Sequence, residues 1–117
     1  MPQENNEKDM ERLVKDYQLT QEQLRLYSIQ LEQFKAQKAE LERAKEELGT
    51  ASGKVYISVG GVIVETTKEK AVSDVADRLE LSDTRIAAAT KQYNELRSRE
   101  KTLSEKITEI YKSSKPG

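Results

Sequence analysis

The side chains that could do chemistry in this sequence are almost all carboxylates and cations. The chain has 21 Asp and Glu residues, 20 Lys and Arg residues, no Cys and no His. Without Cys and His there are no thiol nucleophiles, disulfides, histidine acids or bases, or usual structural zinc ligands. Paired carboxylates act as acid and base where a pocket shifts their pKa values, but here their spacing is typical of solvated helix faces. We therefore expect no catalytic residues, no metal and no cofactor, and interpret the protein as not an enzyme.

One glycine pair raises a second possibility, a phosphate-binding loop. Gly60-Gly61 follows an apolar run, as the glycines of a phosphate-binding loop do. A second apolar run follows in place of a helix, however, and no Gly-Lys-Ser/Thr sequence occurs. We interpret the pair as the two-residue turn of a β-hairpin, because glycine tolerates positive φ at both central positions of a primed turn.

With catalysis and phosphate binding set aside, the remaining kind of interaction is the burial of apolar surface. The hairpin is the first place where the sequence predicts it. Strands pairing outward from the turn place six residues on one face: Val55, Ile57, Val59, Val62, Val64 and Thr66. A lone two-stranded hairpin is marginal in water, and one with two open edges should pair with other strands. We predict that these six residues, the assembly face, pack against other chains.

Seven-residue repeats flank the hairpin on both sides. From Met10 to Leu48, nine of the twelve a and d positions are apolar, and from Val72 to Ile110 ten of twelve are. The two repeats mirror one another about Gly60, which predicts an antiparallel coiled coil within the chain. The fold class is thus mainly α with one central hairpin, a single domain over residues 1–117. The expected elements are a helix over 8–48, the hairpin over 55–66 and a helix over 67–112.

The helix ends are predicted from capping residues. Asn6 is placed to cap the first helix, and Gly49 to stop it. Thr66 with Glu69 reads as a capping box that starts the second helix.

The mirror also predicts ion pairs along the flanks of the coiled coil. It places Asp16 against Lys106 and Lys35 against Asp83. These pairs would support pairing within one chain.

Apolar residues outside the repeat are the remaining clue. Between residues 35 and 47 the positions off the repeat are charged, Gln or Ala, whereas nearer the N-terminus they include Leu26 and Ile29. Single exposed leucines are normal, and a wider or slipped seam would explain each one. As a group gathered toward one end they indicate an interaction surface. The predicted tip surface comprises Met10, Leu13, Val14, Tyr17, Leu19, Leu103, Ile107, Ile110 and Tyr111.

Charge and hydropathy exclude several classes of partner. The net charge is −1 with no block of like charge, so we expect no nucleic acid and no anionic membrane surface as partners. No apolar run approaches membrane-spanning length, and the first residues lack the apolar core of a signal peptide. We expect a soluble, cytoplasmic protein.

The hairpin and the start of the second helix resemble the prefoldin family, specifically its β-type subunit with one hairpin. The match runs through Val55-Tyr56, Gly60, Val62-Ile63-Val64 and residues 66–72. This resemblance implies a hexamer of two α-type and four β-type subunits, this chain assembling with α-type subunits and other copies of itself. The hairpins would join an intersubunit β-barrel, and the coiled-coil tips would hold unfolded client proteins without ATP and deliver them to a group II chaperonin.

Two functions follow as hypotheses. The first is a chaperone subunit that binds non-native clients through the tip surface. The alternative is a structural coiled-coil subunit that oligomerises through its hairpin and docks one specific folded partner. Protection of unrelated unfolded chains would separate them, because only the first hypothesis predicts it.

Overall fold

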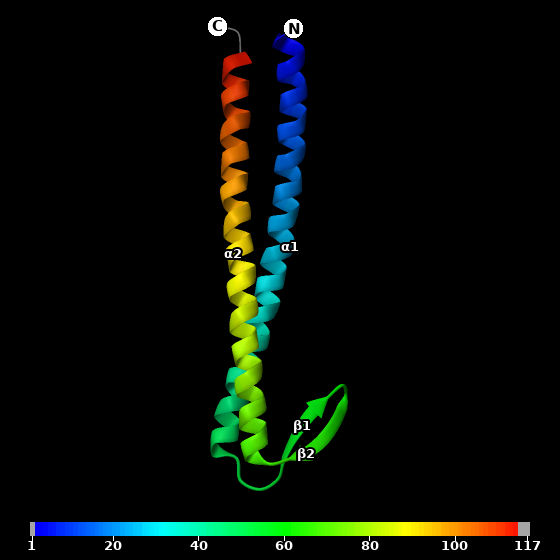
Figure 1. Cartoon of the computed structure of the whole chain (residues 1–117), viewed down its shortest axis with the longest axis vertical. Coiled ribbons are helices and arrows are strands. Elements are labelled where there is room, and N and C mark those ends of the chain that lie inside the picture. The colour runs from blue at the N-terminus through cyan, green and yellow to red at the C-terminus, as the bar shows by residue number, and fades with distance from the viewer. Residues whose placement is uncertain (1, 115–117) are drawn as a thin grey trace. The chain divides into compact units, whose positions relative to one another are not determined.

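The computed structural model describes residues 2–114 and the side chains of residues 7–113. In chain order the elements are helix α1 (Pro2–Thr50), strand β1 (Val55–Val59), strand β2 (Val62–Thr66) and helix α2 (Lys68–Ser114) (Figure 1). The mainly helical fold with one central hairpin is therefore confirmed. Within residues 2–114, neither helix has a stretch long and apolar enough to cross a membrane.

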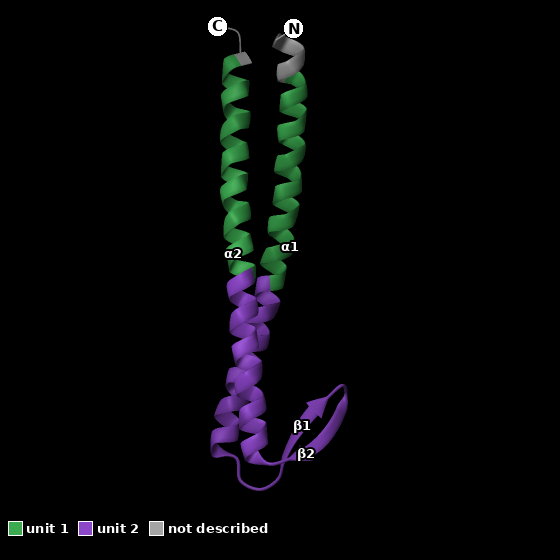
Figure 2. Ribbon diagram, in the orientation of Figure 1, with its two compact units in different colours: residues 1–30, 89–117 green, residues 31–88 purple. Residues whose placement is uncertain are grey.

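The chain divides into two compact units, each containing part of both helices (Figure 2). The first, which we call the terminal unit, comprises residues 1–30 and 89–117; the second, the hairpin unit, comprises residues 31–88. An ion pair links α1 to α2 inside each unit. Arg99 lies 4.0 Å from Asp16 in the terminal unit, and Lys38 lies 2.6 Å from Asp83 in the hairpin unit. The two helices therefore pack side by side within each unit.

The seam between the helices follows the predicted repeat. All but one of the twelve a and d residues of each helix are buried or half-buried. The exceptions are Lys45 and Val72, and both belong to the hairpin unit. There Ala44 is half-buried and Ala71 is buried, one position before each expected residue. In this part of the hairpin unit the seam is therefore displaced by one position from the strict seven-residue repeat.

The predicted ends of α1 are wrong. The helix begins at Pro2, so Asn6 lies inside it and does not start it. Proline suits a first helical position because it has no N–H to leave unpaired. The helix ends at Thr50, and Gly49 lacks the positive φ that a left-handed stop requires.

The predicted start of α2 is wrong by one residue. The Thr67 hydroxyl accepts a hydrogen bond from the Lys70 N–H at 3.1 Å, so Thr67 is the N-cap. Thr66 is instead the last residue of β2, paired with Val55. Because the sheet ladder holds Thr66, the neighbouring threonine takes the capping role.

The end of α1 receives a cap from the start of α2. The last turn of α1 contains no basic residue, and helix C-termini leave carbonyl groups unpaired and carry partial negative charge. The Lys68 ammonium group donates to the carbonyl oxygens of Gly49 and Ala51, each at 3.4 Å. One side chain thus ties together both helix ends that border the hairpin.

Candidate functional site

The hairpin has the predicted turn and register. β1 and β2 are antiparallel, with Val59 opposite Val62, and Val55 opposite Thr66 at the far end. Gly60 and Gly61 have φ values of 53° and 84°, which a primed turn needs at both central positions. This register places the six predicted residues on one face.

That face is covered by the chain at its base and open toward the turn. Val55 is buried, and Ile57 and Thr66 are half-buried. Val59, Val62 and Val64 are exposed, Val62 to 61%. Fully burying an exposed side chain of this kind stabilises by about 1.5–3 kcal/mol. The turn half of the assembly face is therefore the part available to a partner.

The opposite face of the hairpin is mixed, with Ser58 opposite Ile63 and Tyr56 opposite Glu65. Ile63 is 74% exposed, and Tyr56 is exposed on the same face. We predicted only the first face as an assembly surface, so these two residues were missed. The sequence does contain a signal for them: Val62-Ile63-Val64 is an unbroken apolar run, which is typical of strands covered on both faces.

The nine residues of the predicted tip surface all lie in the terminal unit, but they differ in exposure. Leu19 and Tyr111 are exposed, and Val14 is 36% exposed. Leu103 is buried. Five are half-buried: Met10, Leu13, Tyr17, Ile107 and Ile110. The exposed residues are accessible to a partner as they stand, whereas the seam residues would become fully accessible only where the helix ends open locally.

Two exposed residues of α1 extend this surface. Leu26 and Ile29 are exposed, like Leu19. Spacings of seven and three residues put the three side chains on one stripe of the helix. The sequence showed Leu26 and Ile29 to be off the seam, but the predicted tip surface did not include them.

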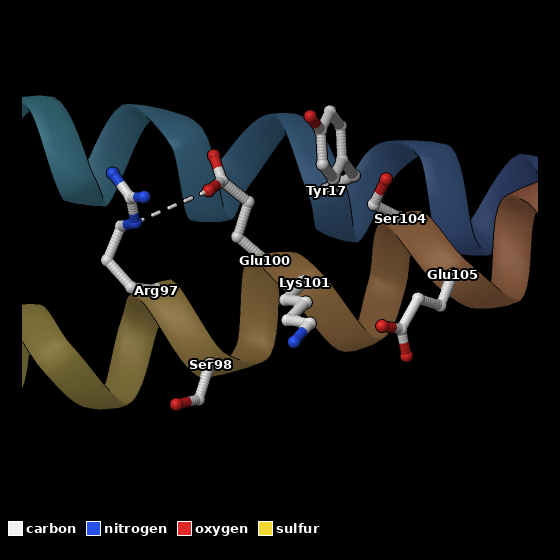
Figure 3. A pocket seen from close by; sticks show the side chains of 7 residues that line it. All are labelled: Tyr17, Arg97, Ser98, Glu100, Lys101, Ser104 and Glu105. Carbon is white, nitrogen blue, oxygen red and sulfur yellow. Dashed lines mark ion pairs between the residues drawn. The ribbon is translucent and has the colours of Figure 1, made fainter.

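A shallow hollow of about 510 Å³ lies beside Tyr17 in the terminal unit (Figure 3). Tyr17 comes from α1, and the other lining residues come from α2. These are mostly charged and include Arg97 and Glu100, whose side chains lie 3.9 Å apart. An aromatic ring bordered by charges of both signs suits contact with a partly polar segment and provides no enclosed pocket for catalysis.

Ion pairs within and between the helices favour the ionised forms of several surface side chains. The Arg25 guanidinium donates to Glu22 and lowers the pKa of that carboxyl group. The hydrogen bond to Asp83, together with its charge, raises the pKa of Lys38. Asp83 thus pairs with Lys38, and Asp16 with Arg99, instead of the predicted Lys35 and Lys106. Among the side chains of residues 7–113, no group of three acidic residues is placed to hold a metal ion.

The fold and these surfaces define a class: two-helix coiled-coil proteins whose single hairpin exposes apolar residues on both faces. Comparison with known proteins agrees. The family model described as Prefoldin subunit matches residues 11–114. The chain belongs to the prefoldin subunit family, and its one-hairpin architecture is that of the β-type subunit.

Individual relatives are consistent with this assignment. The chain is 36% identical over 64 residues to the prefoldin subunit beta of Pyrococcus horikoshii, covering 53% of this chain and 55% of that protein. It is 40% identical over 53 residues to that of Methanosarcina mazei, covering 45% of each. The aligned stretch thus spans about half the length of these curated relatives. The crystal structure of the prefoldin beta subunit from Thermococcus strain KS-1 superposes with a TM-score of 0.79 at 26% identity, covering 93% of this chain and 95% of that one.

Proposed function

We propose that this chain is a subunit of a chaperone that holds unfolded proteins without ATP and delivers them to a group II chaperonin. The observation that carries the proposal is the group of exposed apolar side chains in the terminal unit, including Leu19 and Tyr111. Membership of the prefoldin subunit family supports the same function. The proposal includes no enzymatic activity and no cofactor, and places the protein in the cytoplasm.

The hairpin supports the assembly that this function needs. Val62 and Ile63 are exposed on opposite faces. Within residues 2–114 each strand pairs only with the other, which leaves one edge of each unpaired. Exposed strand edges and apolar faces favour pairing with further strands. We propose that the hairpin joins an intersubunit β-barrel with α-type subunits and other copies of this chain, in a hexamer of two α-type and four β-type subunits.

Client binding would come from dispersed hydrophobic contacts. Unfolded chains expose apolar side chains in no fixed arrangement, so a surface of separate leucines and tyrosines can contact many sequences. Each contact is weak, and several copies of the terminal unit acting on one client raise the overall affinity. Charged residues between these side chains, such as the Glu22–Arg25 pair, would keep the protein soluble without a client.

The test is light scattering from a chemically unfolded client diluted into buffer with the assembled protein. We expect the native assembly to suppress aggregation and the triple variant Val14→Ser, Leu19→Ser, Tyr111→Ser to lose most of that suppression. Val72→Ser is the control, because Val72 is also an exposed apolar helix residue but belongs to the hairpin unit. Sedimentation must first show that all three proteins assemble alike.

Two outcomes would overturn the proposal. Equal suppression by the native protein and the triple variant would remove the tip surface from client binding. No suppression by either would favour the structural alternative, in which the coiled coil docks one folded partner.

A further inference from the structure

A second groove lies between the helices, within the hairpin unit. It has a volume of about 440 Å³ and is lined by residues of α1 between Gln37 and Ala44 and of α2 between Arg78 and Arg85. None of its lining residues belongs to the assembly face or to the predicted tip surface. The proposed chaperone function therefore does not account for it.

The floor of this groove is apolar. Leu81 lies off the seam and is 48% exposed. Leu41, a half-buried seam residue, lines the same groove. Ala44 and Ser82 line the same hollow with small side chains, which leave room that larger residues would fill. The floor can thus accept one apolar side chain of a partner.

The α2 wall of the groove is basic. Arg78 and Arg85 lie three residues before and four residues after Leu81, so all three share one helix face. At 1.5 Å per residue the two arginines are about 10.5 Å apart along the axis. Asp74 holds Nε of Arg78 at 2.9 Å, which orients a guanidinium whose terminal nitrogens carry four further N–H donors.

The α1 wall differs in charge. Glu40 lies on this wall together with Gln37. A carboxylate brought to this side would meet a like charge, whereas one brought to the α2 side would meet two guanidinium groups. The groove therefore favours a ligand whose carboxylates face α2.

We propose that this groove docks a short acidic segment of a partner protein, in which one apolar side chain lies between two carboxylates. The apolar side chain would cover Leu81, and the carboxylates would pair with Arg78 and Arg85, where charge-assisted bonds can be bidentate. A polyproline II segment rises about 3.1 Å per residue and has three residues per turn, so carboxylates three residues apart lie on one side of it, about 9.3 Å apart, close to the spacing of the two arginines. The ligand is thus an extended Glu-Leu-X-Glu type of sequence.

The experiment uses the full-length assembled protein and a fluorescein-labelled twelve-residue peptide with a central Glu-Leu-Gly-Glu, otherwise glycine and serine. Fluorescence anisotropy measures binding. We expect saturable binding that weakens about tenfold or more when the two peptide glutamates become glutamine, because the charge-assisted bonds are lost. The double variant Arg78→Glu, Arg85→Glu should show the same loss, and Leu81→Gln a loss in the same direction.

Two controls separate this site from general attraction. Arg43→Glu reverses an exposed charge of α1 outside the groove and should leave the affinity unchanged. A peptide with lysine in place of both glutamates should bind the Arg78→Glu, Arg85→Glu variant better than it binds the native protein. Such charge-swap recovery requires a folded site, so it also excludes misfolding as the cause of the lost binding.

The proposal is overturned if the glutamine peptide binds as well as the glutamate peptide. It is also overturned if the native protein fails to bind the glutamate peptide. A lower assembly mass for Leu81→Gln in sedimentation would then show that another subunit covers the groove. Client protection by the native assembly is measured separately, so failure of this site and failure of the chaperone function are distinguishable.

Discussion

At the scale of single residues, buried and exposed leucines lie two positions apart on α1. Leu24 is buried in the seam, whereas Leu26 is 54% exposed. The two side chains are chemically identical and sit on the same helix with the same propensity. Comparing them isolates the effect of packing against α2.

We expect Leu24→Ala to lower the free energy of unfolding by about 2–4 kcal/mol, because it removes buried methylenes and leaves a cavity. Leu26→Ala should change it by no more than about 0.5 kcal/mol, as for an ordinary surface position. Urea unfolding at one fixed protein concentration measures both, since assembly makes stability depend on concentration. Similar losses for the two variants would mean that Leu26 is covered by another chain.

Lys38 is a cation at a seam position, and its ammonium group forms an ion pair with the Asp83 carboxylate at 2.6 Å. Its pKa is raised above the ordinary value of 10.5 by the hydrogen bond to Asp83 and by that carboxylate's charge. A group whose pKa is raised on folding stabilises fully below its unfolded pKa, and the effect is lost as the pH rises through its folded pKa. Lys38 should therefore stabilise the fold at neutral pH and cease to do so in strong alkali.

The check is the melting temperature of the native protein relative to Lys38→Gln, measured from about pH 8 to about pH 12. The advantage of the native protein should be constant up to about pH 10 and shrink above it. Asp83→Asn should remove the same pH dependence, because it removes the partner. An advantage that stays constant across the whole range would show that the pair contributes nothing through charge.

At the scale of elements, periodic features could be predicted and element boundaries could not. The Gly60-Gly61 turn fixes the strand register by itself, and a repeat over 39 residues identifies the seam despite local drift. The N-cap depends on a competition that a single sequence does not resolve: Thr66 and Thr67 can both cap, and only the strand pairing of Thr66 with Val55 decides.

The predicted flank pairs failed for a related reason. Long, flexible side chains can reach several residues along a neighbouring helix, so Asp16 meets Arg99 and Asp83 meets Lys38. The exposed Ile63 was left out of the assembly face because its side of the hairpin also carries Ser58 and Glu65. Spacing therefore predicts which face a residue occupies, but not its ion-pair partner or the degree to which it is covered.

The junction between helices and hairpin yields a prediction at this scale. Lys68 donates to two carbonyl groups at the end of α1, where a cation also complements the helix dipole. We expect Lys68→Met, which keeps most of the apolar stem, to lower stability by about 0.3–1 kcal/mol. Lys70→Met is the matched control, because Lys70 is an exposed lysine of the same helix turn. Thermal unfolding of both at low and high salt measures the effect, and equal behaviour of the two variants would argue against the cap.

At the scale of the whole molecule, assembly and client binding should use different residues, but client affinity should depend on assembly. The exposed assembly face belongs to the hairpin unit and the tip surface to the terminal unit. A change in the hairpin can therefore leave every client-contacting side chain intact. If client affinity depends on several subunits acting together, that change should still weaken it.

Val62→Asp provides this test, because it places a charge on a side chain that is 61% exposed in the single chain and that should be buried on assembly. We expect smaller species in analytical ultracentrifugation, and client affinity per chain lower by about 10²-fold or more, the gain that multivalent binding provides. Ser52→Asp is the control, since it adds the same single negative charge at an exposed position outside the strands and should leave both quantities unchanged. Smaller species with unchanged client affinity would mean that each terminal unit binds clients independently. An unchanged mass would instead show that the hairpin does not hold the assembly together.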